Sequence, residues 1–173
     1  MSVLVPIAVA LFVAHMLATF LGASSITFAE WQYFHAIVDG RIEAGERAHL
    51  VTLFFSLRFA LIMVLLVNIL LGFVLAAAGS SFVPGLTTAY WFEMGIILVL
   101  ITTSWLRFHG RIPFWAGSSI AFVGWWYLAG MDLGFVPVTD FAAAALGFAV
   151  SVIVLAALFG YVRFLVRSSS LRA

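Results

Sequence analysis

Residues 30–49, EWQYFHAIVDGRIEAGERAH, form a polar segment in a chain that is otherwise almost entirely apolar. The segment holds four of the seven acidic residues, two of the four histidines and two of the eight basic residues, all of which are arginines. A long apolar run stands on each side of it. This alternation of one polar segment with long apolar runs determines the predicted fold.

The composition predicts that lipid is the solvent of most of the chain. Hydrophobic residues make up 65%, charged residues 9%, and the mean hydropathy is +1.22, whereas a soluble domain has about 25% charged residues. The length of 173 residues accommodates four or five membrane spans and no sizeable extramembrane domain. The absence of cysteine excludes disulfides, iron–sulfur clusters and covalent c-type haem attachment. A net charge of +1 gives no indication of a nucleic-acid partner.

We expect an all-α fold, in which one domain over 1–173 is a bundle of five transmembrane helices. The apolar runs place these spans at about 3–22, 51–78, 86–106, 114–130 and 141–162. Beyond Gly22 the first helix is expected to continue as an amphipathic stretch into the membrane interface, with Trp31 and Tyr33 at headgroup depth. Asp39-Gly40 should then end it, and residues 30–49 are interpreted as the polar cytoplasmic loop between the first two spans.

The distribution of arginine predicts the orientation of the bundle. With five crossings, seven of the eight arginines fall on one side, and these are Arg41, Arg47, Arg107, Arg111, Arg163, Arg167 and Arg172. Because positively charged loops stay in the cytoplasm, the N-terminus is expected outside and the C-terminus in the cytoplasm. Four or six spans would instead scatter the arginines over both sides.

Four polar residues fall inside the predicted spans, where such side chains are costly and mark functional sites: His15, Arg58, Glu93 and Asn68. Counting along the helices places Arg58 and Glu93 at depths that differ by about 8 Å, which predicts an interaction between them. The alternative is that Arg58 extends to the cytoplasmic interface and Glu93 is protonated.

The histidines suggest a b-type haem, which needs two imidazoles from different helices. His49 and His109 are expected at the same depth in the membrane. His15 and His109 reach the same depth only if the first span is displaced or tilted, because counting along the helices leaves about 10 Å between them. Arg58 would neutralise a haem propionate or a semiquinone. The alternative for each histidine is an interfacial aromatic or a hydrogen-bonding group; for His15, a role as ligand or proton relay stands beside this alternative, because a histidine within a span is rare.

One further motif, Glu46-x-x-His49, has the spacing that di-iron bundles use, but those sites need two such motifs and more carboxylates. Glu46 and His49 are therefore expected to orient the start of the second span. The sequence contains no nucleophile–base arrangement, phosphate loop or CxxC motif.

The chain resembles an uncharacterised family of small five-span integral membrane proteins of bacteria. The residues that carry this resemblance are His15, Gly22, Glu30, Phe34, Asp39-Gly40-Arg41-Ile42, Glu46, Phe108-His109, Pro113 and the stretch 119–127. His15, Gly22 and Arg58 also give a distant likeness to membrane haem proteins of the HemJ-type protoporphyrinogen oxidase and copper-resistance-D kind. That likeness implies haem at His15 and redox activity in the membrane, although the tyrosine- and lysine-containing motifs of the oxidase are missing.

The sequence-based hypothesis is a polytopic membrane protein, in the bacterial inner membrane, that binds haem b and acts in membrane redox or electron transfer. Two alternatives stay open. One is a non-enzymatic subunit whose charged loop binds a cytoplasmic or membrane protein partner, and homo-oligomers are compatible with it. The other is a small proton-coupled carrier that uses His15, Arg58 and Glu93 as a relay, although five spans cannot be divided into the two equal halves of an inverted repeat.

Overall fold

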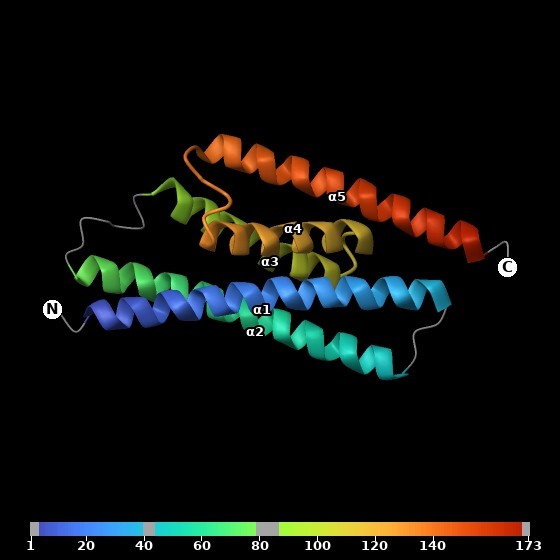
Figure 1. Ribbon diagram of the computed structural model, residues 1–173, viewed down its shortest axis with the longest axis horizontal. Helices are drawn as coiled ribbons and strands as arrows, with labels where there is room; N and C mark the ends of the chain where they lie inside the picture. The colour runs from blue at the N-terminus through green and yellow to red at the C-terminus, as the bar shows by residue number, and fades with distance from the viewer. Residues whose placement is uncertain (1–3, 40–43, 79–86, 171–173) are drawn as a thin grey trace.

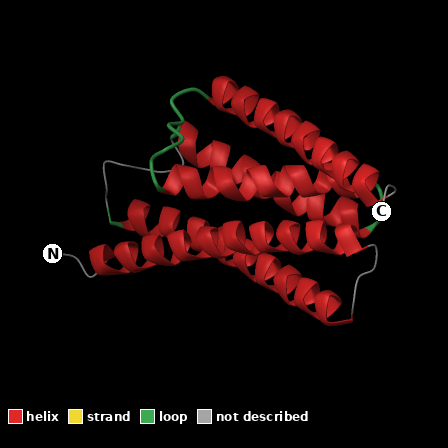
Figure 2. Cartoon of the chain, turned by 45° about the vertical axis from the view of Figure 1, so that its right-hand side comes forward, coloured by secondary structure: helices red, strands yellow, loops and turns green. Residues whose placement is uncertain are grey.

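The computed structural model describes residues 4–39, 44–78 and 87–170, without the side chains of 36–39 and 166–170. Its five helices are α1 (Leu4–Asp39), α2 (Ala44–Ala77), α3 (Thr88–Phe108), α4 (Phe114–Asp132) and α5 (Phe141–Ser170). Figure 2 shows helices joined by short connections and no strand in the described ranges. The predicted all-α fold is therefore confirmed.

The helices run alternately up and down along the long axis of the molecule, so that α1 begins and α5 ends at opposite ends of the bundle (Figure 1). The ends of α1, α3 and α5 and the starts of α2 and α4 lie together. We call this the arginine end, because it carries Arg47, Arg107, Arg111 and Arg163. Arg167 lies on the last turns of α5, and Arg41 and Arg172 are outside the described residues.

The protein is a membrane protein by the length and composition of its helices. Four helical segments in the described chain are long and apolar enough to cross a bilayer: Leu4–His35 of α1, α2, α3 and Phe141–Leu165 of α5. Large apolar side chains such as Leu17, Phe55 and Ile153 cover their outer faces, as contact with lipid requires.

Helix α4 is not among these four segments. It packs against α1, α3 and α5 and lies between them in Figure 1. Its buried residues include small and polar ones, Gly117, Ser118, Ser119 and Gly124. The small and polar residues of α4 therefore face the neighbouring helices.

The predicted loop over 30–49 is wrong for most of its length, since residues 30–39 belong to α1 and residues 44–49 to α2. The continuation of the first helix as far as Asp39 is confirmed. Trp31 is 64% exposed, whereas Glu30 is 5% exposed and points into the bundle. Glu30 therefore faces protein, whereas Trp31 and His35 face outward.

The centre of the bundle is an apolar layer that contains Ile26, Val64, Ile96, Ile97, Leu100 and Trp125. Gly22 lets α1 approach α4 there, because a Cβ at this position would overlap the indole ring of Trp125. Helices α4 and α5 meet where the Tyr127 hydroxyl lies 3.2 Å from Ser151 Oγ and beside Gly147. Gly147 and Ser151 thus form the part of α5 that contacts the end of the Tyr127 side chain.

We expect Gly22→Ala to destabilise the protein by about 1–3 kcal/mol, because the added methyl group must displace a buried ring from a packed layer. The free energy of unfolding in mixed micelles measures this. Gly95→Ala in α3 is the matched control, since a Cβ there meets nothing within 4 Å. It should raise the free energy of unfolding by no more than about 1 kcal/mol, because alanine favours a helix more than glycine does. Equal effects of the two substitutions would contradict the close approach of α1 to α4.

Candidate functional site

His15 of α1 lies between two carboxylates inside the bundle. The residue is 5% exposed. Its Nε2 atom is 2.7 Å from Glu93 Oε1 on α3, and its Nδ1 atom is 3.2 Å from Asp132 Oδ1 on α4. Three helices that are distant in sequence therefore meet at one imidazole.

Two neutral side chains complete this group. The Thr19 hydroxyl, one turn after His15 on α1, donates to Asp132 Oδ2 at 2.5 Å. The Asn68 amide of α2 donates to Glu93 Oε1 at 2.9 Å. We call His15, Thr19, Asn68, Glu93 and Asp132 the His15 cluster. Each carboxylate thus contacts His15 and accepts a hydrogen bond from one neutral donor. Such contacts offset the cost of removing a buried charge from water.

The position of Asp132 follows from how α4 ends. Asp132 is the last residue of the helix, and Gly134, with φ of 72°, turns the chain away. An acidic residue at a helix C-terminus is disfavoured by the helix dipole. Its contact with His15 is therefore the interaction that makes this position favourable.

The chemistry available to the cluster is proton binding. A histidine donates hydrogen bonds through both ring nitrogens only when it carries the extra proton. One imidazole and two carboxylates can share protons in several arrangements, and the net charge of the group changes with their number. Glu93 and Asn68 also line a pocket of about 420 Å³, together with Phe12, Thr87 and Tyr90. The cluster is therefore adjacent to a hollow from which protons can exchange.

The predicted Arg58–Glu93 interaction is wrong. Glu93 contacts His15 and Asn68, and among the described residues no acidic side chain lies within 4 Å of Arg58. Ten residues of α2 separate Arg58 from Asn68, about 15 Å of helix. Counting from the predicted helix ends failed here because α1 and α2 extend well beyond the apolar runs.

The histidines do not fit the predicted haem site at His15. Both of its ring nitrogens face carboxylates. His109 follows Glu93 by sixteen residues and His49 precedes Asn68 by nineteen, about 24 and 28 Å along their helices. No single iron can bridge such distances, so His15 pairs with neither.

His49 and His109 lie exposed at the arginine end, and the Nδ1 atom of His109 is 2.9 Å from the carbonyl oxygen of Trp105 in its own helix. Within the described part of the chain, no group of three or more histidine or acidic side chains could hold a metal ion.

A second buried charged group lies towards the arginine end. Ser118 of α4 donates to Glu30 Oε1, and Arg163 Nη2 of α5 is 3.5 Å from Glu30 Oε2. The side chains of Glu30 and Arg163 are 6% and 11% exposed. The Arg163 guanidinium also lies 5.0 Å from the ring centre of Tyr33. We call Glu30, Ser118 and Arg163 the Glu30 cluster; it joins α1, α4 and α5.

Sequence reasoning selected His15, Glu93 and Asn68 but missed Asp132, Glu30 and Arg163. All three of these residues lie outside the predicted spans 3–22, 114–130 and 141–162. One signal could have found Asp132: a histidine within a span requires a charged partner, and Asp132 is an acid at the end of a helix whose dipole disfavours it. The carboxylates of Asp39 and Glu43 lie outside the described side chains.

Comparison of the chain with family models, with curated proteins and with solved structures finds no match. The function is therefore inferred from the geometry of the site.

The His15 contact should appear as a coupling free energy. Replacing His15 with Leu leaves two buried carboxylates without their shared partner, and we expect a loss of about 3–5 kcal/mol in the free energy of unfolding. The double variant His15→Leu/Glu93→Leu should lose less than the sum of the single variants by at least about 1 kcal/mol.

The control cycle combines Glu93→Leu with Arg58→Leu, because Glu93 and Arg58 are not in contact. It should be additive within about 0.5 kcal/mol. Additivity of the His15–Glu93 pair, or coupling in the control pair, would contradict the observed arrangement.

Proposed function

We propose that the protein is a small proton-coupled membrane carrier whose proton-binding centre is the His15 cluster. The observation that carries this proposal is a buried histidine with each ring nitrogen against a carboxylate, where one of these carboxylates lines a pocket. Ionisable groups inside a helix bundle that face one another are characteristic of proton pathways in transporters.

The packing of the helices supports coupling between protonation and movement. Helix α2 packs mainly on α1 and only lightly on α3, whereas α4 packs on α1, α3 and α5. The His15 cluster joins α1 to α3 through Glu93 and to α4 through Asp132. Protonation of either carboxylate weakens an ionic contact between α1 and one of these helices. The proton count at the cluster would thus bias the position of α1 relative to α3 and α4.

Two pockets lie at different depths in the bundle. The pocket beside Glu93 is lined by residues 68–75 of α2 and 87–93 of α3, and a second pocket by residues 54–61 of α2 and 100–108 of α3. Buried Val64, Val67, Ile96 and Ile97 lie between these stretches. Hollows on either side of an apolar layer suit alternate opening to the two sides of a membrane. Five helices cannot be divided into the two equal halves of an inverted repeat. The cluster and the pockets are therefore the features that support a carrier.

We further propose that α4 also crosses the membrane, in the inner membrane of a bacterium, with the arginine end in the cytoplasm. The nineteen residues of α4 span about 28 Å as a helix, close to the thickness of the hydrocarbon core. The arginines at one end of the bundle support the orientation.

A transient current tests the proton-binding centre without knowledge of the substrate. An acid jump applied to proteoliposomes on a solid-supported membrane should give a charge displacement, because a proton enters a site within the membrane. Glu93→Gln and His15→Gln should reduce this current to the level of protein-free liposomes. Asp140→Asn is the matched control, since Asp140 lies outside the cluster and caps α5, and it should leave the current unchanged. A full current in Glu93→Gln would refute the proposal.

Single cysteines test the orientation, because the chain contains no cysteine of its own. His109→Cys lies in the α3–α4 connection and Phe135→Cys in the α4–α5 connection. In intact cells an impermeant maleimide should label Phe135→Cys and leave His109→Cys unlabelled until the membrane is opened. Labelling of both in intact cells would show that α4 does not span, and the reverse pattern would invert the orientation.

A further inference from the structure

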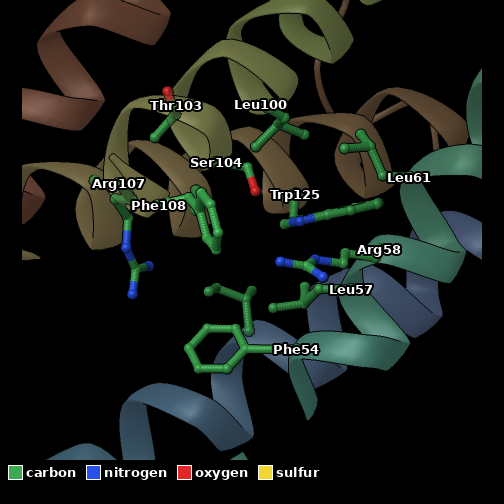
Figure 3. A pocket seen from close by; sticks show the side chains of 13 residues that line it. Phe54, Leu57, Arg58, Leu61, Leu100, Thr103, Ser104, Arg107, Phe108 and Trp125 are labelled. Carbon is green, nitrogen blue, oxygen red and sulfur yellow. The ribbon is translucent and has the colours of Figure 1, made fainter. Parts of the chain in front are cut away.

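The pocket towards the arginine end contains two cationic side chains and no acidic one among the described residues that line it. Arg58 of α2 and Arg107 of α3 both line this hollow of about 270 Å³. Figure 3 shows the two arginines with Phe54, Phe108 and Trp125 around the same space. Apart from Thr103 and Ser104, the other lining residues are apolar, and two positive charges in such a pocket attract an anion.

The charges of both arginines are only partly compensated by the protein. No acidic side chain in the described residues lies within 4 Å of Arg58 or Arg107. Glu30 interacts electrostatically with Arg107, but its carboxylate is held by Ser118 and Arg163. The Arg107 guanidinium lies 4.6 Å from the ring centre of Phe114 and 5.6 Å from that of Phe54. These aromatic contacts orient Arg107 and leave its donors available.

The pocket opens where a lipid can enter. Helix α2 diverges from the rest of the bundle towards the arginine end, as both Figure 1 and Figure 2 show. The pocket lies between this part of α2 and the last turns of α3, with Gly117 and Ala121 of α4 behind it. Phe54 and Phe108 on its rim are 39% and 78% exposed. The mouth of the pocket therefore has the apolar character of the lipid-facing surface.

We propose that this pocket binds a lipid that carries a phosphate monoester, with the phosphate between Arg58 and Arg107 and the apolar chain along Phe54, Leu57 and Leu61. A phosphate monoester has a charge of about −1.5 to −2 and three acceptor oxygens, which matches two guanidinium groups. Arginine binds phosphate through paired parallel hydrogen bonds. The aliphatic walls suit a chain that stays in contact with the bilayer.

This inference does not rest on the proton-coupled carrier. Its two arginines are outside the His15 cluster, and equilibrium binding requires no transport. The carrier proposal can fail in the current measurement while lipid binding is retained, and the reverse is equally possible.

Native mass spectrometry of the purified protein tests the inference with individual lipids. Phosphatidic acid should bind more tightly than phosphatidylglycerol, a phosphodiester with a single charge, and phosphatidylcholine should bind most weakly. Arg58→Gln should weaken phosphatidic acid binding by about tenfold, because one charge-assisted interaction is lost. Arg58→Lys keeps the charge but not the paired donors, and should lie between wild type and Arg58→Gln.

Arg111→Gln is the matched control, since Arg111 is an exposed arginine at the same end and does not line the pocket. It should bind phosphatidic acid as wild type does. Equal losses in Arg58→Gln and Arg111→Gln would overturn the site. Equal binding of phosphatidic acid and phosphatidylglycerol would overturn the monoester, and tighter binding of oleate or of inorganic phosphate would overturn the lipid phosphate. Unchanged helicity in Arg58→Gln and Arg58→Lys shows that a loss of binding is not a loss of fold.

Discussion

The cost of burying charge in a membrane bundle is the constraint on which the rest of this structure depends. His15 inside a span is tolerable only because Glu93 and Asp132 face it, and each carboxylate has a further neutral donor. These contacts hold α1 against α3 and α4. Helix α4 lies among α1, α3 and α5, where its buried serines meet protein instead of lipid.

The charges form two layers separated by apolar packing. Ser118 and Asp132 lie fourteen residues apart on α4, so the Glu30 and His15 clusters are about 21 Å apart along the helix. Between them Trp125 packs against Gly22, and buried Ile96 and Val64 complete the layer. The described residues of this core layer are apolar, so none of them is a titratable side chain that joins the two clusters. Under the carrier proposal, transport would therefore require a movement of helices that exposes the clusters in turn.

The sequence predicted the architecture well because the architecture depends on a solvent effect. Long apolar runs and the positions of arginine predicted five helices. The described chain has these five helices. Each begins within a few residues of its expected start except α2, which begins at Ala44 because polar turns precede its apolar run. The site was harder to predict. His15, Glu93 and Asn68 stood out as polar residues within spans, but their pairing depends on the depth of each helix, which changed when α1 and α2 proved longer than their apolar runs. Asp132 was missed because a residue at a helix end carries no periodic signal of burial.

The distribution of charge along the bundle is asymmetric, and this asymmetry unites the two proposals. The His15 cluster has two carboxylates for one imidazole, so it can be neutral only by holding protons. The pocket at the arginine end has two guanidinium groups and, in the described residues, no carboxylate within salt-bridge distance, so it approaches neutrality only with an anion. Because uncompensated charge is expensive at low dielectric, each centre favours its own counter-charge, protons at one level and an anionic group at the other.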